Sequence, residues 1–389
     1  MRIAAPKESR PGERRVALAP DSCKKLIQAG YAISIERGAG EAAFYADEAY
    51  REVGATMETD PAAMLGSADI VLMVNAPAAG PAGRGEIQWM RPETILLGSL
   101  MPLRNLEAVR ALADRRISAF STDAIPRTTR AQAMDTLSSM ANITGYKGVL
   151  LAAGELGRYF PMLMTAAGTV FPARVFVIGA AVAGLQAIAT ARRLGANVFA
   201  TDVRPEVKEQ IESLGAKYVG VELKESASAG GGYARELSEE DKARQRELLA
   251  EQCVAADVVV TTALIGGVIA PKLITAAMVR RMRPGSIIVD LGADGGGNCE
   301  LSRPGDSVVE NGVRIIAPLN LPAAMPAHAS LLFSRNLAAF IQAFTRDKSF
   351  KLDLSDDIQR SSIITHGGEI LHAKTKEALQ GVREAGARS

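Results

Sequence analysis

The sequence predicts an α/β protein with two doubly wound parallel-sheet domains, joined by long helices and separated by a cleft. Short β-branched segments alternate with helical segments along most of the chain, which is the pattern of parallel sheets covered by helices. The chain has 389 residues, enough for two domains. Aromatic residues make up only 5%, so aliphatic side chains are expected to fill the cores, as suits helix-covered sheets.

The first 125 residues contain one set of expected strands, with no glycine-rich nucleotide turn among them. After them, residues 128–165 have no clear strand pattern, and residues 131–151 predict a long helix. This half therefore predicts an α/β domain without a nucleotide site of its own. The expected strands are residues 2–5, 32–36, 69–74, 94–100 and 117–122.

The middle of the chain predicts a second and more regular sheet. Residues 185–196 and 205–216 have helical spacing and separate the first three strands; Gly195 is suited to end the first helix, and Pro205 to begin the second. Strands that alternate with helices in this way fit one dinucleotide-binding unit. The six expected strands are residues 174–179, 197–202, 217–223, 257–263, 286–292 and 314–319.

The domain boundaries follow from the long helices. A helix at residues 329–344 precedes the C-terminal tail. Two helices that bracket one domain indicate that the chain crosses to that domain and returns. We therefore expect an N-terminal domain of residues 1–127 completed by 346–389, a linker helix and nucleotide-contacting loop at 128–165, a nucleotide-binding domain at 166–328, and a return helix at 329–345.

Charge and cysteine content exclude several classes of protein. Lys plus Arg number 45 and Asp plus Glu 43, a net charge of +2 that gives no reason to expect a nucleic-acid partner. Cys23, Cys253 and Cys299 form no paired motif, so we expect neither disulfides nor a metal site, and a reduced cytoplasmic chain. The N-terminus has no signal-peptide pattern, and the uncharged residues 175–191 fit a strand, turn and helix better than a membrane span.

A glycine-rich turn at the start of the second sheet predicts a Rossmann-like dinucleotide site. Gly179 permits the tight turn after the strand, and Gly184 permits close packing of the helix on the strand. Ala181 replaces the middle glycine, and its methyl group is expected to push the phosphates of a nucleotide outward. The alternative is a βαβ turn that binds no ligand.

Two residues of the next strand end bear on the choice of nucleotide. Asp202 would accept hydrogen bonds from the adenosine ribose and repel a 2′-phosphate, which favours NAD over NADP. Arg204 keeps NADP open, because a guanidinium can bind that phosphate. A second glycine cluster, residues 228–233, ends in Tyr233 and would either close over a ligand or serve as a plain connector.

Histidines are scarce where a dehydrogenase of hydroxy or amino acids would need a proton carrier. The three histidines, His328, His366 and His372, all lie in the last part of the chain. Such enzymes usually place a His, Lys or Tyr with a near-neutral pKa beside the substrate. The chemistry is therefore expected to centre on the nucleotide itself.

Several segments resemble one protein family. Residues 1–20 resemble the N-terminus shared by alanine dehydrogenases and the NAD-binding alpha subunits of proton-translocating transhydrogenases, and residues 126–146 resemble the transhydrogenase signature. The resemblance covers nearly the whole chain. Further matching segments, in the family's order, are residues 165–179, 201–216, 231–234, 261–267 and 290–300.

The resemblance implies a subunit that binds NAD(H) and passes a hydride from NADH to NADP(H) on a partner subunit, coupled to proton translocation. No substrate proton moves in that step, which agrees with the scarcity of histidines. The family implies a homodimer, and membrane-embedded and NADP-binding partners on other chains. It also implies a cytoplasmic location, peripheral to the inner membrane through those partners, as in bacteria whose NAD-binding component is a separate chain.

The resemblance also assigns site residues by motif position. Arg127 would contact the nicotinamide carboxamide and Gln132 the junction with the second nucleotide's ribose. Asp135 and Ser138 would hold the nicotinamide ribose and carboxamide, and Tyr233 would tip a mobile loop. Taken alone, these residues are more typical of an exposed Arg127–Asp135 ion pair, a solvated glutamine and a serine bonded to its own helix, and the resemblance reverses that preference. The expected NAD pocket is completed by Val182, Asp202, Val203, Arg204, Gly232, Gln245 and Leu264.

Two other functions are weighed against this one. Alanine dehydrogenases use an arginine, a lysine and a histidine where this chain has Arg15, Met73 and Ser99. A methionine cannot anchor a carboxylate and a serine does not exchange protons near neutral pH, so amino-acid dehydrogenation is disfavoured. A non-catalytic NAD-binding or assembly module would fit if Ala181 and Gly266 weaken the pocket.

Overall fold

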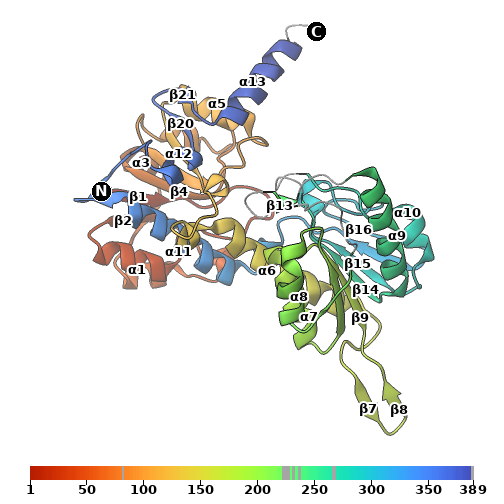
Figure 1. Cartoon of the computed structure of the whole chain (residues 1–389). Helices are drawn as coiled ribbons and strands as arrows, with labels where there is room; N and C mark the ends of the chain where they lie inside the picture. Colours follow the sequence, from red (N-terminus) through yellow and green to blue (C-terminus); the bar gives the residue numbers. More distant parts are fainter. Residues whose placement is uncertain (81–82, 221–227, 230–232, 235–237, 265–268, 387–389) are drawn as a thin grey trace. The chain divides into compact units, whose positions relative to one another are not determined.

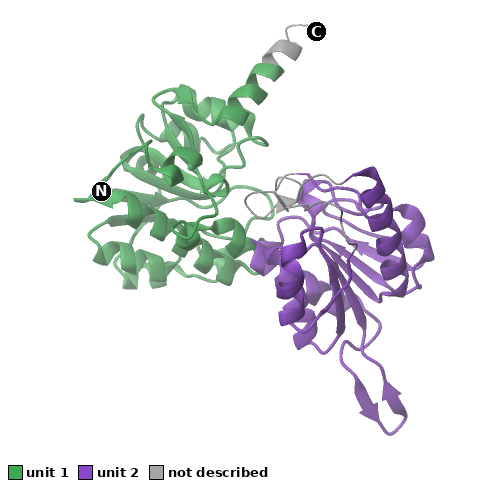
Figure 2. Ribbon diagram, viewed as in Figure 1, with its two compact units in different colours: residues 1–140, 323–389 green, residues 141–322 purple. Residues whose placement is uncertain are grey.

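The computed structural model describes residues 1–80, 83–220, 228–229, 233–234, 238–264 and 269–386. It divides into two compact α/β units (Figure 2): the first comprises residues 1–140 and 323–389, the second residues 141–322. Helix α6 (Thr136–Glu155) carries the chain from the first unit into the second. Helix α11 (Pro326–Phe344) begins just after the chain returns.

The first unit is built on one sheet with the strand order β21-β20-β6-β5-β4-β1-β2-β3. Figure 1 labels β1, β2, β4, β20 and β21 of this sheet. All five strands expected in this half are present and pair in parallel. The tail adds β20 and β21 as antiparallel strands at one edge, which the sequence pattern did not predict. The strands are β1 Arg2–Ala5, β2 Ala32–Glu36, β3 Thr56–Glu58, β4 Ile70–Asn75, β5 Ile95–Ser99, β6 Ser118–Ser121, β20 Ile363–His366 and β21 Glu369–Ile370.

Both faces of this sheet are buried, because alternate side chains of each strand enter different cores. On β4, Ile70 and Leu72 pack with α1 (Pro20–Gln28) and α11, whereas Val71 and Met73 pack on the opposite face. Burial of an aliphatic side chain contributes about 1.5–3 kcal/mol, so a continuous apolar strand of this kind stabilises both layers. The helices on the second face are α3 Pro61–Ser67, α4 Glu86–Trp89 and α5 Leu106–Asp114.

The second unit has the strand order β11-β10-β9-β14-β15-β17-β16. Its first strand, β9, is central, so the winding reverses between β9 and β14, where doubly wound sheets bind ligands at the carboxyl ends of their strands. The strands are β9 Arg174–Ile178, β10 Asn197–Thr201, β11 Lys217–Tyr218, β14 Val258–Thr261, β15 Ile287–Asp290, β17 Val313–Ile316 and the antiparallel edge strand β16 Ser307–Glu310. The helices are α7 Val182–Arg193, α8 Lys208–Ser213, α9 Glu239–Ala255 and α10 Ala276–Arg281.

The segment between the first sheet and β9 differs from the expectation in two ways. The long helix, expected from residue 131, begins at Thr136 because Gln132–Met134 form a 3-10 turn and Asp135 caps α6. Strand β7 (Leu163–Thr165) lies at the end of the segment 128–165 that was expected to lack strands. It forms a hairpin with β8 (Gly168–Val170), and this hairpin projects from the second unit (Figure 1).

Among the described residues, no helix combines the length and apolarity needed to cross a bilayer. The remaining helices and strands lie between the elements given above or in the tail. They are α2 Asp47–Glu52, α12 Asp357–Ser362, α13 Ala373–Gly386, β12 Ser228–Ala229, β13 Tyr233–Ala234, β18 Thr345–Arg346 and β19 Ser349–Phe350.

Candidate functional site

The turn between β9 and α7 has the geometry of a nucleotide-binding turn. Gly179 has a φ of 91°, a left-handed conformation that favours glycine. The hydroxyl of Thr262, just after β14, donates to the Gly179 carbonyl oxygen at 3.0 Å. A Cβ at position 179 would lie 2.7 Å from that hydroxyl. Glycine is therefore required here both by the backbone and by the neighbouring strand end.

Gly184 lets the first turn of α7 pack directly on this strand end. A Cβ at position 184 would lie 1.9 Å from the carbonyl oxygen of Gly179, so no larger residue fits without movement. The amides at the start of a helix have no acceptor within it and, with the helix dipole, attract anions. The close packing therefore places the start of α7 at the carboxyl edge of the sheet, next to the Gly179 turn.

Ala181 does not distort this turn. It is the N-cap of α7, with φ −76° and ψ −168°, an extended backbone that any residue adopts. The residue is exposed, so its methyl group meets solvent rather than the packed core. The departure from the glycine pattern thus alters the surface that a phosphate would approach and leaves the backbone conformation intact.

Asp202 lies at the end of β10, beside the glycine turn. Its Oδ2 accepts from the Ala180 amide at 2.7 Å and from Nη2 of Arg204 at 2.8 Å. Its Oδ1 accepts from the backbone amide and from Nε of Arg204, both at 2.9 Å. The hydrogen bonds and charge of Asp202 raise the pKa of Arg204 despite burial of the guanidinium. Sequence alone did not indicate that these two side chains would pair.

The structure describes some of the other expected pocket residues and not others. Val182, Val203 and Leu264 are half-buried, at the start of α7 and just after β10 and β14, so they lie at the same edge of the sheet. Gln245 is half-buried on α9. Tyr233 is described only through its backbone, where β13 pairs with β12. Gly232 and Gly266 lie outside the described residues.

Asn298 is a supporting residue that the sequence pattern did not single out. Its Oδ1 accepts from the Ala263 amide at 3.1 Å, and its Nδ2 donates to the Ala263 carbonyl oxygen at 2.9 Å. The side chain thus holds Ala263 on both sides, one residue before Leu264. The motif at residues 290–300 contained this asparagine, but only the folded loop shows what it bonds.

The candidates for hydride transfer lie in the first unit, apart in the chain from the glycine turn. Arg127 and Gln132 are exposed. Asp135 and Ser138 pair with each other: Asp135 accepts from the Ser138 amide at 2.8 Å and from its hydroxyl at 2.6 Å, which caps α6. A capping role therefore accounts for these two residues in the absence of a ligand.

The residues at the alanine-dehydrogenase positions form no free substrate site. Nε and Nη2 of Arg15 donate to the two carboxylate oxygens of Glu13, at 2.8 and 2.7 Å. Asn75 also donates to Glu13, at 2.9 Å. Met73 is buried in the apolar core, and Ser99 donates to Asp123 at 3.2 Å. The arginine is already neutralised, and neither replacement can anchor or protonate a substrate.

The same network contains a carboxyl group with a shifted pKa. Burial raises the pKa of Glu8 from 4.5 to about 7, although hydrogen bonds from Asn75 and Val74 oppose the shift. Burial also acts on Glu13, but there the hydrogen bonds and charge of Arg15 outweigh it and lower the pKa to about 2. The pKa values of the neighbouring Glu8 and Glu13 carboxyl groups are thus shifted in opposite directions.

Replacing Glu8 by glutamine is expected to change how stability depends on pH. The folded protein keeps the Glu8 proton up to about pH 7, whereas the unfolded chain releases it near 4.5. Stabilisation from this group is therefore complete below pH 4.5 and is lost as the pH rises through 7. Relative to the wild type, Glu8→Gln should gain about 1–3 kcal/mol between these limits. Thermal melts from pH 4.5 to 8 test this, with the exposed Glu107→Gln variant as the control. If the Tm of Glu8→Gln follows pH in parallel with the Tm of the wild type, the prediction is wrong.

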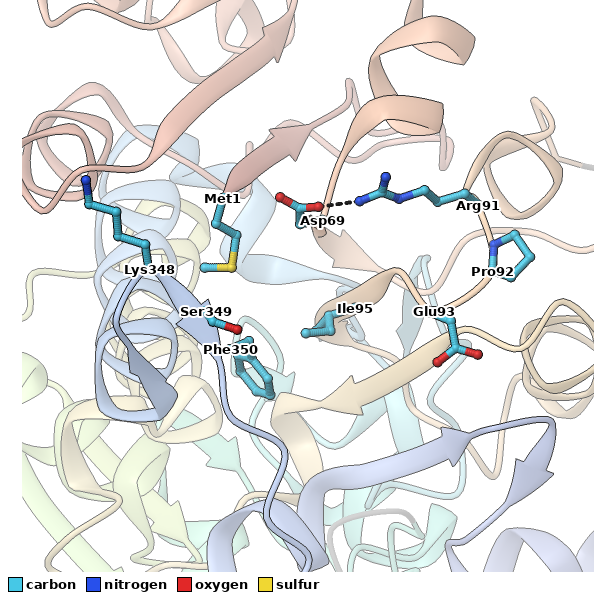
Figure 3. Close-up of a pocket in the computed structure, with 9 residues that line it drawn as sticks. All are labelled: Met1, Asp69, Arg91, Pro92, Glu93, Ile95, Lys348, Ser349 and Phe350. Carbon is cyan, nitrogen blue, oxygen red and sulfur yellow. Dashed lines mark hydrogen bonds and ion pairs between the residues drawn. The ribbon is translucent and has the colours of Figure 1, made fainter.

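A cavity of about 570 Å³ lies elsewhere, at the N-terminal edge of the first unit's sheet (Figure 3). Asp69 and Arg91 form an ion pair at its rim, and Ile95 and Phe350 contribute apolar surface. Ligands of doubly wound sheets bind at the opposite, carboxyl edge. The cavity is therefore not the nucleotide site.

The comparisons with known proteins cover nearly the whole chain. Residues 4–144 match the family model described as alanine dehydrogenase/PNT, N-terminal domain, and residues 148–373 match the corresponding C-terminal domain. The chain is 46% identical over 377 residues to the first part of NAD(P) transhydrogenase subunit alpha of Rhodospirillum rubrum, covering 96% of this chain and 98% of that protein. It is 28% identical over 387 residues to an alanine dehydrogenase of Halomonas elongata, covering 97% of each. A crystal structure of transhydrogenase from Sinorhizobium meliloti matches with a TM-score of 0.86 and 42% identity, over 95% of this chain and 100% of that one.

Proposed function

Because the chain belongs to the alanine dehydrogenase/PNT family and, within it, to the NAD(P) transhydrogenase alpha subunits, we propose that it binds NAD(H) and exchanges a hydride with NADP(H) on a partner subunit. Proton translocation would be coupled to that exchange. The acceptor is a second nicotinamide ring, so the protein needs to align two rings and exclude water rather than supply an acid or base.

The observation that carries the proposal is the turn from β9 to α7 with Asp202 beside it. The first-turn amides of α7 would bind the pyrophosphate, and the carboxylate of Asp202 would accept from the adenosine ribose. Val182, Val203 and Leu264, with Gln245 and Gly232, would line the remainder of the pocket. Asn298 would fix the position of Leu264 through its two hydrogen bonds to the backbone of Ala263.

The transfer residues belong to the same proposal. Arg127 and Ser138 would hold the nicotinamide carboxamide, and Asp135 the ribose. The Asp135–Ser138 pair already caps the start of α6, so a nucleotide would compete for its hydroxyl rather than reorder the helix. Tyr233 would close over the bound nucleotide.

Titration of NADH and then NADPH into the isolated chain tests the proposal. Nucleotide fluorescence and calorimetric heat should show binding of NADH with much weaker binding of NADPH. Addition of an NADP-binding transhydrogenase subunit should then yield NADH-dependent reduction of NADP. Absence of binding by either nucleotide would favour the non-catalytic module, and NADH oxidation that depends on pyruvate and ammonia would revive amino-acid dehydrogenation.

We also infer a homodimer, formed through the second unit and bound peripherally to the inner membrane by membrane-embedded partner subunits. The β7–β8 hairpin supports the dimer, because apolar side chains on it and just after it are exposed: Met164 on β7 by 82%, and Phe171, which follows β8, by 80%. Exposed apolar groups gathered on one projecting element are typical of interaction sites.

Substitution of Met164 by aspartate is expected to shift the protein from dimer to monomer. A charge in the apolar centre of an interface costs several kcal/mol by desolvation, enough to separate the subunits at micromolar concentration. Sedimentation equilibrium measures the mass. Val309→Asp places the same charge on β16, at a residue 60% exposed in the same unit, and should leave the mass unchanged. A Met164→Asp protein that remains dimeric would exclude the hairpin from the interface.

A further inference from the structure

Asp202, the carboxylate on which nucleotide choice rests, is already occupied by Arg204. Both oxygens accept two hydrogen bonds each: Oδ1 from the amide and Nε of Arg204, Oδ2 from the Ala180 amide and Nη2 of Arg204. A carboxylate has about four lone-pair sites in all. A ribose hydroxyl can therefore bond to Asp202 only if a donor now in place gives way.

Arg204 is the donor that can give way. The amides of Ala180 and Arg204 are fixed by the backbone, whereas the guanidinium is carried on a side chain with several rotatable bonds. The side chains of Arg204 and Asp202 are only 11% and 6% exposed, so the charges act on each other with little screening by water. The guanidinium thus offsets the negative charge of Asp202 where the adenosine ribose would lie.

We propose that Arg204 determines how strongly the site discriminates between NAD(H) and NADP(H), by competing with the ribose for Asp202 and cancelling its charge. The inference rests on the proposed NAD(H) site. With the 2′-hydroxyl of NAD(H), the guanidinium is a competitor that weakens binding. With the 2′-phosphate of NADP(H), it is a counter-charge and a planar donor that reduces the repulsion from Asp202. Removal of Arg204 alone therefore widens the preference for NAD(H).

The test is calorimetric titration with four probes: NADH, NADPH, 5′-AMP and adenosine 2′,5′-bisphosphate. The last two carry only the adenosine end and isolate this part of the site. Arg204→Met keeps the aliphatic stem and should raise the ratio of the Kd for NADPH to that for NADH by about tenfold, the effect of one charged hydrogen bond. The ratio of the Kd for adenosine 2′,5′-bisphosphate to that for 5′-AMP should rise by the same factor. Asp202→Asn should lower the ratio, because it frees the guanidinium for the phosphate.

Two controls keep the outcome interpretable. Arg193→Met removes an exposed arginine from the last turn of α7 and should leave the ratio unchanged. If Arg204→Met does not fold, because Asp202 is left without its counter-charge, Arg204→Lys keeps the charge but loses the fork and should raise the ratio by a smaller amount. Wild-type protein that binds no probe would overturn both the proposed function and this inference. If the wild-type protein binds NADH and both Arg204 variants keep the wild-type ratio of the NADPH and NADH Kd values, the inference alone is overturned.

Discussion

Replacement of Gly184 by alanine is expected to lower the affinity for NADH by about tenfold to hundredfold. The added methyl group would lie 1.9 Å from the Gly179 carbonyl oxygen, a backbone atom held by Thr262, so α7 must move away from β9. The amides of the first helical turn then leave the positions that suit the pyrophosphate. Each charged hydrogen bond lost costs about 1.5–3 kcal/mol, and 1.4 kcal/mol is a factor of ten in affinity.

The matched control is Gly154→Ala, in α6 of the same unit. A Cβ there meets no atom within 4 Å, and alanine favours a helix more than glycine does, so neither the NADH affinity nor the fold should suffer. Calorimetric titration gives the affinities, and thermal melts separate a local shift from unfolding. Overpacking costs about 1–3 kcal/mol, so Gly184→Ala should remain folded at 25 °C. NADH affinity equal to that of the wild type would remove the turn from the binding site.

The strands and the glycine turn were predictable because their signals are local. A β-branched run forms a strand wherever both of its faces are buried, and all eleven expected strands start within two residues of the expected position. Gly179 has the positive φ that a tight turn after a strand requires. The antiparallel strands β16, β20 and β21 were not anticipated, because alternation with helices predicts only the parallel neighbours. The parallel edge strand β3 was also missed, because it has only three residues.

The start of α6 shows a competition that the sequence pattern hides. Residues 131–135 have helical composition, but the side chain of Asp135 bonds the amide and hydroxyl of Ser138 and so ends the turn before it. Ala131 and Met134 enter the core of the first unit, which fixes the 3-10 turn. A short acidic side chain at a cap outweighs helix propensity over one turn.

The site could be predicted only in outline, because its partners come from distant segments. Asp202 and Arg204 are two residues apart, yet nothing in the sequence requires the guanidinium to fold back on the carboxylate. Asn298 bonds Ala263 across 35 residues of chain, and Thr262 bonds Gly179 across 83. Such contacts depend on the strand order, which brings β9, β14 and the loop after β15 to one edge.

Shortening Gln132 to asparagine is expected to slow hydride transfer by about tenfold or more while leaving the affinity for NADH nearly unchanged. The 3-10 turn is anchored by Ala131 and Met134, both buried, and Asn336 donates to the carbonyl oxygen of Ala133 at 2.8 Å. Gln132 itself is exposed, so loss of one methylene alters the reach of its amide and not the packing of the turn. Because the proposed role of that amide is to meet the ribose of the second nucleotide, only the alignment of the two rings should suffer, and misplacement by about 1 Å costs as much as a hundredfold in rate.

Gln28→Asn, at an exposed glutamine at the end of α1, makes the same chemical change in the same unit away from the turn and should transfer hydride at the wild-type rate. Stopped-flow measurement of NADH oxidation in a complex reconstituted with an NADP-binding subunit gives the transfer rate, and calorimetry on the isolated chain gives the NADH affinity. A rate loss with intact affinity places Gln132 at the meeting point of the two nucleotides, since an interaction made only during transfer lowers the rate without weakening ground-state binding. An unchanged rate would exclude Gln132 from that role, and a parallel loss of affinity would assign it to the NAD(H) pocket instead.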